Sequence, residues 1–101
     1  MSQITTHVLD SGVGRPAAGV PVRLEAADGT LLAAATTDDD GRVRDLGPDA
    51  VDPGTYRLVF DVAARSDFFP SVTITFTVTD GSHHHVPLLL SPFAYSTYRG
   101  S

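Results

Sequence analysis

The groups best able to do chemistry gather at the end of the sequence and around its histidines. The last four residues, Tyr98, Arg99, Gly100 and Ser101, supply a phenol, a guanidinium, a hydroxyl and the terminal carboxylate. A chain end normally frays unless something ties it down. Because the preceding run at residues 85–92 is apolar enough for burial, we expect the tail to be held in a site.

Three of the four histidines lie together, and the fourth, His7, falls in the first expected strand. Side chains alternate between the two faces of a strand, so His83 and His85 share one face and His84 points to the other. An imidazole titrates near neutral pH and therefore suits general acid–base catalysis. The alternative for each histidine is a solvated or structurally satisfied side chain.

A metal site at the histidine cluster is a second hypothesis, because His83 and His85 could offer two imidazoles to one ion. Such a site needs a third and a fourth ligand, and nothing in the sequence has the spacing of a zinc motif. The chain contains no cysteine, which excludes disulfides, thiolate nucleophiles and thiolate zinc ligands. We therefore expect no metal and no cofactor.

Arg42 follows the acidic turn at residues 38–41, where its planar fork of donors could reach a bound anion. The alternative is a surface arginine that neutralises the three aspartates of this turn and contributes little stability. A Ser–His–Asp triad can be assembled on paper, but the sequence lacks the Gly-x-Ser-x-Gly turn that presents such a serine. General acid–base chemistry, with a cation for the developing oxyanion, needs fewer assumptions.

Length and charge limit the class of protein. A formal net charge of −5, with seven arginines and no lysine, argues against nucleic acid or an anionic membrane as partner and excludes a Schiff-base lysine. We expect one domain, residues 1–101, which alone buries only about 60–65% of its unfolded surface, so an oligomer would help it. The chain shows neither a secretory signal nor a membrane span, so we expect a cytoplasmic protein.

Short alternating segments separated by turn residues must position these groups. We expect eight strands, at residues 4–10, 20–25, 31–37, 42–46, 56–62, 72–79, 83–90 and 94–98. The only candidate for a helical turn is the segment 63–68, which Phe69-Pro70 would end. The pattern predicts an all-β protein, an antiparallel two-sheet sandwich of immunoglobulin-like size with one short helix.

Several motifs together are similar to those of one enzyme family. They are THVLD at residues 6–10, GRPAAGV at 14–20, DGR at 40–42, YR at 56–57, FFP at 68–70, HVPLLLSP at 85–92 and YSTYRGS at 95–101. From end to end the chain thereby resembles the 5-hydroxyisourate hydrolases, transthyretin-like enzymes of purine breakdown. The terminal Tyr-Arg-Gly-Ser distinguishes these hydrolases from transthyretin, the hormone carrier of the same fold.

The resemblance implies a transthyretin-like (prealbumin-like) sandwich that assembles as a homotetramer, a dimer of dimers, with active sites where the dimers meet. It also implies that His7, Arg42 and Tyr98 bind the substrate. A further catalytic histidine of the family falls on His85, and Ser101 closes the same pocket. The catalytic set expected from the resemblance is therefore His7, Arg42, His85 and Ser101.

The reaction implied is hydrolytic opening of the ring of 5-hydroxyisourate at a lactam-type C–N bond, which gives 2-oxo-4-hydroxy-4-carboxy-5-ureidoimidazoline in urate degradation. In this hypothesis His7 or His85 activates water, while Arg42 holds the planar anion and stabilises charge on oxygen. Either histidine can be the base. The family usually has His-Tyr-His where this chain has three histidines, and His84, pointing away from His85, should affect packing only.

Two other classes of protein are alternatives. A transthyretin-like carrier would bind a small aromatic anion in the tetramer channel without turnover, whereas the polar set of His7, Arg42 and His85 favours a small polar heterocycle. An immunoglobulin-like adhesion or structural module would have no small-molecule activity and no role for the last four residues.

Overall fold

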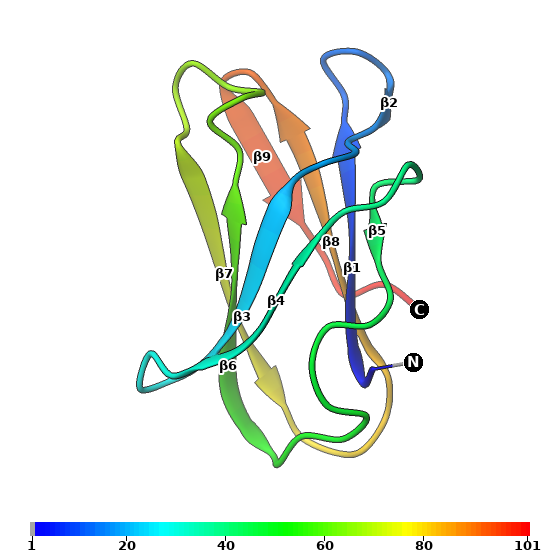
Figure 1. Cartoon of the computed structure of the whole chain (residues 1–101), viewed down its shortest axis with the longest axis vertical. Coiled ribbons are helices and arrows are strands. Elements are labelled where there is room, and N and C mark those ends of the chain that lie inside the picture. Colours follow the sequence, from blue (N-terminus) through cyan, green and yellow to red (C-terminus); the bar gives the residue numbers. More distant parts are fainter. Residues whose placement is uncertain (1) are drawn as a thin grey trace.

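The computed structural model describes residues 2–101, which fold into two β-sheets packed face to face (Figure 1). The strands are β1 (Ile4–Asp10), β2 (Arg15–Pro16), β3 (Pro21–Ala26), β4 (Leu31–Thr36), β5 (Arg42–Val43), β6 (Gly54–Asp61), β7 (Ser71–Val78), β8 (His84–Ser91) and β9 (Ala94–Thr97). The expected all-β, two-sheet sandwich is confirmed. The short strand β2 was expected as part of a turn.

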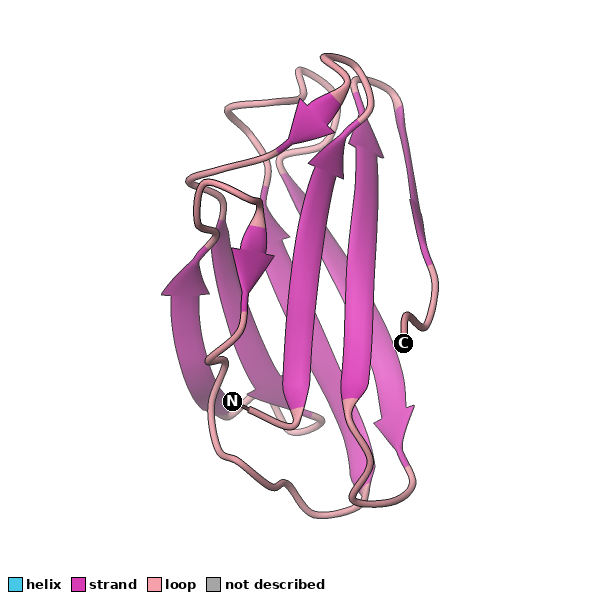
Figure 2. Cartoon of the chain, turned by 90° about the vertical axis from the view of Figure 1, so that its right-hand side faces the viewer, coloured by secondary structure: helices cyan, strands magenta, loops and turns pink. Residues whose placement is uncertain are grey.

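Each sheet forms one layer of the sandwich, and Figure 2 looks onto the five-stranded sheet with the other sheet behind it. The five-stranded sheet has the order β2-β1-β8-β9, with β5 also paired to β1. The four-stranded sheet has the order β4-β3-β6-β7. Within the described part of the chain there is no helix with the length and hydrophobicity needed to span a membrane.

One strand pair departs from the antiparallel arrangement expected from the sequence. β1 and β8 run parallel, with Ile4 opposite His84 at one end and Asp10 opposite Leu90 at the other. A parallel pair needs a long crossover connection, and here the whole four-stranded sheet lies between the two strands in sequence. The alternation of side chains carries no information on strand direction. The prediction of a wholly antiparallel sandwich was therefore wrong at this pair, which is the one that builds the site.

The segment between β6 and β7 forms a turn instead of the expected short helix. The backbone nitrogens of Arg65 and Ser66 both donate to the carbonyl oxygen of Val62, at 2.9 and 3.1 Å, and the helix does not continue. Helix nucleation is unfavourable and needs more residues than the segment 63–68 offers before Pro70. No helix occurs among residues 2–101.

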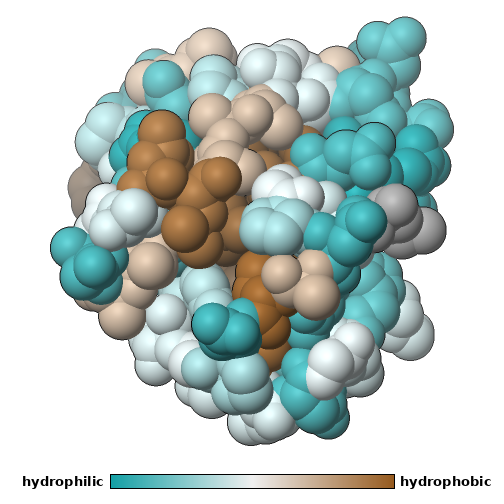
Figure 3. Space-filling model, turned by 60° about the horizontal axis from the view of Figure 1, so that its bottom comes forward, coloured by the Kyte–Doolittle hydropathy of each residue, from teal (hydrophilic) through white to brown (hydrophobic). Residues whose placement is uncertain are grey.

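The hydrophobic core lies between the two sheets. Its largest fully buried side chains are Phe60, Ile4, Leu24, Leu46, Leu58, Leu88 and Leu90. Each contributes about 1.5–3 kcal/mol relative to an exposed position. Figure 3, with the lower end of the molecule turned forward, shows a small hydrophobic patch enclosed by polar residues. Because the core takes the inner faces of both sheets, the outer face of the five-stranded sheet is available for polar side chains.

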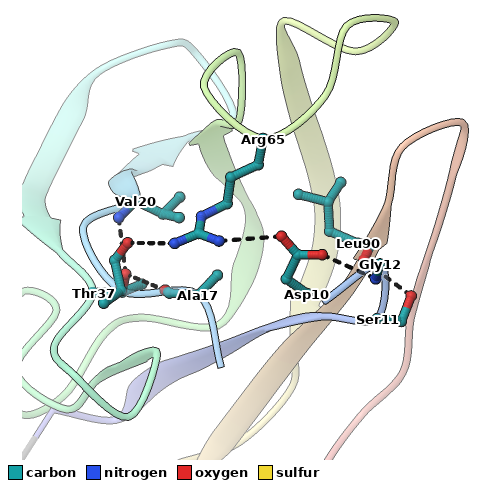
Figure 4. Close-up of polar contacts among 9 residues, drawn as sticks. Asp10, Ser11, Gly12, Ala17, Val20, Thr37, Arg65 and Leu90 are labelled. Atoms are coloured by element: carbon teal, nitrogen blue, oxygen red, sulfur yellow. Dashed lines mark hydrogen bonds and ion pairs between the residues drawn. The ribbon is translucent and has the colours of Figure 1, made fainter. Parts of the chain in front are cut away.

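A buried carboxylate fastens the loops at the upper end of the sandwich (Figure 4). The Asp10 Oδ2 atom accepts a hydrogen bond from Arg65 Nη1 at 3.1 Å, and its Oδ1 accepts one from the Gly12 nitrogen at 3.0 Å. Arg65 Nη2 also donates to the Ala18 carbonyl oxygen at 3.0 Å. Arg65 thereby ties the turn after β6 to β1 and to the loop after β2.

Replacing Arg65 by Met is expected to lower the free energy of unfolding by about 1–3 kcal/mol, because the Asp10 carboxylate loses a charged partner while its side chain is only 9% exposed. Urea denaturation followed by circular dichroism measures the change. Arg23→Met is the control, because Arg23 forms an ion pair with Glu25 while its own side chain is 49% exposed. Removing this exposed ion pair should lower the free energy of unfolding by less than about 1 kcal/mol. Equal losses in both variants would contradict the fastening role of Arg65.

Candidate active site

Strand register brings the polar groups together on the outer face of the five-stranded sheet. Along β1, Thr5 lies opposite His85 of β8, and His7 lies opposite Arg42 of β5. Thr5 and His7 are two residues apart, so they share one face of β1. That face is turned away from the core, since Ile4 and Val8, on the opposite face of β1, belong to the core.

A pocket of about 200 Å³ opens on this face. Its lining residues are Thr5, Thr6, Arg42, Val43, Arg44, His83, His85 and Ser101. Three of the residues expected to form the site, Arg42, His85 and Ser101, thus line one pocket. His7 lies one step further along β1 outside this lining, and Tyr98 lies elsewhere.

The tight turn before β5 aims Arg42 at this face. Gly41 has a φ of 75°, in the left-handed region, and a Cβ atom there would collide with the carbonyl oxygen of Val8. Its own carbonyl oxygen accepts a hydrogen bond from the Val8 nitrogen at 2.7 Å. Only glycine combines this conformation with so close an approach to β1, so the Asp-Gly step sets where Arg42 enters the sheet.

The guanidinium of Arg42 is available for an anion. The nearby carboxylate of Asp38 forms its ion pair with Arg44, at 3.2 Å. From Arg42 it accepts a hydrogen bond of the backbone nitrogen, at 3.0 Å, and none of the guanidinium. That backbone hydrogen bond lowers the pKa of Asp38. Among residues 2–101, no side chain forms a hydrogen bond or ion pair with the Arg42 guanidinium. The ion pair with the acidic turn is formed by Arg44.

His85 is half-buried and hydrogen-bonded on one side. Its Nδ1 atom lies 2.8 Å from the Thr5 hydroxyl oxygen, and the same oxygen lies 2.7 Å from Nε2 of His83. Burial lowers the pKa of His85, and the electrostatic effect of His83, Arg42 and His7 lowers it further. Neutral pH therefore favours the uncharged imidazole, which is the form that can accept a proton.

His7 is held by the turn that carries Arg42. Its Nε2 atom lies 2.8 Å from the carbonyl oxygen of Asp40, and because a carbonyl only accepts, Nε2 is the donor. In the neutral ring this leaves Nδ1 as the acceptor atom. His7 and Arg42 are thus fixed against each other by one turn.

The C-terminal tail is docked on the site. The Gly100 nitrogen donates to the carbonyl oxygen of His85 at 2.8 Å, and Arg99 Nη2 donates to the Ser82 hydroxyl at 3.2 Å. A Cβ atom at Gly100 would come within 2.6 Å of Cδ2 of the His85 ring. The absence of a side chain at Gly100 is therefore what lets the tail lie against His85 and bring Ser101 to the pocket.

Tyr98 and His84 face a different cavity, of about 240 Å³, between β7 and the chain end. Tyr98 is 56% exposed there. His84 is buried on the core side of β8, as strand alternation predicts, and its Nδ1 donates to the Ser82 carbonyl oxygen at 2.7 Å. Its Nε2 atom has no partner within residues 2–101.

Four lining residues were not expected from the sequence: Thr5, Thr6, Val43 and Arg44. Thr5 does have a signal, since it lies two residues before His7 and so shares its face. Its contact with His85 could not be foreseen, however, because it depends on the parallel pairing of β1 with β8. His83 was considered for a metal site. The described residues include no group of three or more His, Asp or Glu side chains arranged to hold a metal ion.

The fold and the site together define a transthyretin-like sandwich with a His/Arg pocket on the outer face of one sheet. The chain matches the model of the HIUase/Transthyretin family over residues 4–100, and it belongs to this family.

Two relatives align over nearly their whole length. The 5-hydroxyisourate hydrolase of Caulobacter vibrioides is 45% identical, with 100% of both chains covered. The 5-hydroxyisourate hydrolase of Mus musculus is 42% identical, with 99% of this chain and 96% of that protein covered. The uric acid degradation bifunctional protein TTL of Arabidopsis thaliana is 49% identical over 97% of this chain, which spans only 37% of that protein's length.

Solved structures show the same fold. The Klebsiella pneumoniae 5-hydroxyisourate hydrolase superposes with a TM-score of 0.88 at 36% identity, with 97% of this chain and 98% of that chain covered. Sea bream transthyretin in complex with thyroxine superposes with a TM-score of 0.86 at 29% identity, with 97% and 94% covered. The backbone alone therefore does not separate hydrolase from carrier, and the side chains of the pocket must.

Proposed function

We propose that this protein is a hydrolase that opens the ring of 5-hydroxyisourate to give 2-oxo-4-hydroxy-4-carboxy-5-ureidoimidazoline, in the degradation of urate. The observation that carries the proposal is the joint placement of Arg42, His85 and Ser101 around one pocket. A cation beside an uncharged imidazole suits a small, planar, anionic heterocycle. Relatives of full coverage that bear this hydrolase name support the same reaction.

The proposed mechanism is general acid–base catalysis without a metal or cofactor. The imidazole of His85, uncharged near neutral pH, takes a proton from water, and the water oxygen adds to the ring carbonyl. Arg42 binds the planar anion and stabilises the charge that grows on the carbonyl oxygen. The C–N bond then breaks, and the leaving nitrogen receives a proton. His7 lies on the same strand face and binds the substrate with Arg42, while Ser101 closes the pocket.

The active unit is proposed to be a single domain, residues 1–101, assembled as a homotetramer (a dimer of dimers) in the cytoplasm. Tyr98 supports an assembly, because its ring lies beside the second cavity and not beside Arg42 and His85 of its own chain. A role for Tyr98 in substrate binding then requires that it reach the pocket of another subunit. Sedimentation of the wild type and of Tyr98→Phe, with KM for both, tests this.

The experiment that tests the function follows the ultraviolet decay of 5-hydroxyisourate, produced in place from urate by urate oxidase. The rate is measured with and without this protein, and again after treatment with a chelator. Catalytic acceleration that survives chelation supports the metal-free hydrolase. Loss of activity on chelation would overturn the metal-free mechanism. No acceleration, together with stoichiometric binding of an iodinated phenol, would overturn the hydrolase in favour of a carrier.

The pH profile follows from the lowered pKa of His85. A base is active only while it is unprotonated, so the acidic decline of kcat/KM is expected to be centred below pH 6.5, the ordinary pKa of a histidine. Initial rates, corrected for spontaneous decay at each pH, measure the midpoint. A decline centred at or above pH 6.5 would mean that the essential base is not a histidine in the environment of His85.

Gly100→Ala is expected to lower kcat/KM by about tenfold or more, because the added methyl group displaces either the tail or the His85 ring. Gly81→Ala is the matched control, since nothing lies within 4 Å of a Cβ atom at that position. The two variants are compared by the same decay assay and by thermal unfolding. Unchanged kinetics in Gly100→Ala would show that the docked tail does not shape the site.

A further inference from the structure

Thr5 connects two histidines by a single hydroxyl group. Its oxygen lies 2.7 Å from Nε2 of His83 and 2.8 Å from Nδ1 of His85, and the two rings are 6.0 Å apart between centroids. A hydroxyl has one proton, so it must donate to one ring and accept from the other. We propose that Thr5 and His83 are positioning residues that form a proton relay behind His85. This inference rests on the proposed hydrolase function.

The positive charge in the pocket decides which way the two hydrogen bonds of the Thr5 hydroxyl run before the substrate reacts. Arg42 lines the same pocket, and a positive charge favours a lone pair over an N–H group pointing toward it. The Nδ1–H group of His85 therefore donates to Thr5, and the Thr5 hydroxyl donates to Nε2 of His83. This arrangement leaves Nε2 of His85 unprotonated and open to the pocket, which is the state that a base requires.

The relay gives the accepted proton a place to go. When Nε2 of His85 takes a proton from water, the ring becomes a cation that is partly desolvated and close to Arg42 and His7. Transfer of the Nδ1 proton to Thr5, with transfer of the Thr5 proton to His83, moves the charge to His83. His83 is exposed, so solvent stabilises that charge. One proton moves at each step.

The second half of the reaction runs the relay backwards. After the shift, His85 is neutral and carries its proton on Nε2, which faces the pocket. It can then donate this proton to the leaving nitrogen while the proton on His83 returns through Thr5 to Nδ1. The resting state is restored, and the same imidazole has served as base and as acid. The titratable or charged groups that act on His85 are His83, Arg42 and His7, and Arg44 and Ser101 line the same pocket.

The test is a set of paired variants in the decay assay. Thr5→Val keeps the shape and removes the hydroxyl, and it is expected to lower kcat about tenfold or more with KM changed less than about twofold. Thr5→Ser restores the hydroxyl and is expected to recover most of kcat. His83→Gln accepts the Thr5 hydrogen bond but cannot take the charge, so it too is expected to lower kcat. Because His83 is exposed, this variant tests the relay even if Thr5→Val folds poorly.

A double-mutant cycle shows whether the effect passes through His85. In the His85→Ala background, adding Thr5→Val is expected to cause no further loss, because the relay then has no base to serve. An independent further loss would overturn the proposal. So would an unchanged kcat and pH profile in Thr5→Val and His83→Gln, which would leave Thr5 with a purely structural role.

Nitrogen-15 NMR of the labelled wild type separates failure of the relay from failure of the hydrolase assignment. The His85 signals are assigned by their loss in His85→Ala. At a pH where the ring is neutral, we expect a protonated Nδ1 and an unprotonated Nε2, and the opposite tautomer would overturn the relay whether or not the protein hydrolyses 5-hydroxyisourate. Absence of hydrolysis by the wild type, with the expected tautomer present, would instead overturn the proposed function alone.

Discussion

Replacing His85 by Ala is expected to lower kcat/KM for 5-hydroxyisourate by about 10²–10⁴-fold, the usual contribution of a positioned general acid–base group. His85 lines the pocket, its burial keeps the imidazole uncharged near neutral pH, and its Nδ1 is anchored by Thr5. The measurement is the initial rate of substrate decay with the spontaneous rate subtracted. Sedimentation must show the same assembly as the wild type, so that the loss belongs to the chemistry.

His84→Tyr is the matched control for this substitution. It changes the adjacent residue on the same strand, and it introduces the tyrosine usual in the hydrolases that the chain resembles. Because the His84 side chain lies on the opposite face of β8, kcat/KM is expected to stay within about threefold of the wild type. A His85→Ala variant with kinetics as close to the wild type as this control would remove His85 from the catalytic set.

The face of a strand to which each side chain points was the most predictable feature, because successive side chains alternate between the two faces whatever the rest of the fold does. This alternation correctly separated His84 from His85, and it gave β1 its bounds, Ile4–Asp10, without error. Strand direction was not predictable in the same way, since pairing between β1 and β8 joins residues about 80 positions apart. The parallel register, and with it the contact of Thr5 with both histidines, is a tertiary outcome.

The docking of the tail was expected from the apolar run before it, and the structure adds the reason why it can dock. Gly100 leaves room for the His85 ring, a close approach that composition alone does not reveal. The partners of the acidic turn were also beyond sequence reasoning. Arg42 and Arg44 both follow Asp38 closely, and only the turn geometry assigns the ion pair to Arg44. That assignment is what leaves Arg42 available to a substrate.

Replacing Arg42 by Met is expected to lower kcat/KM about 10- to 100-fold, through a higher KM because the anion loses its partner and through a lower kcat because the developing charge does. Hydrogen bonds to charged groups contribute about 1.5–3 kcal/mol, and each 1.4 kcal/mol is a factor of about ten. The variant also removes a positive charge that lowers the pKa of His85. The acidic decline of kcat/KM should therefore move to a higher pH than in the wild type, because His85 becomes easier to protonate.

Arg42→Lys separates the charge from the geometry of the guanidinium. Lysine keeps a positive charge near His85 but presents a single ammonium group in place of a planar fork. We expect this variant to keep the acidic decline near its wild-type position while KM stays raised. If instead Arg42→Lys restores KM fully, the arginine acts as a charge alone, and a planar substrate is not recognised by its fork. If both variants leave KM and the pH profile unchanged, Arg42 is not part of the binding site, and the pocket must hold its anion through Arg44 or His7.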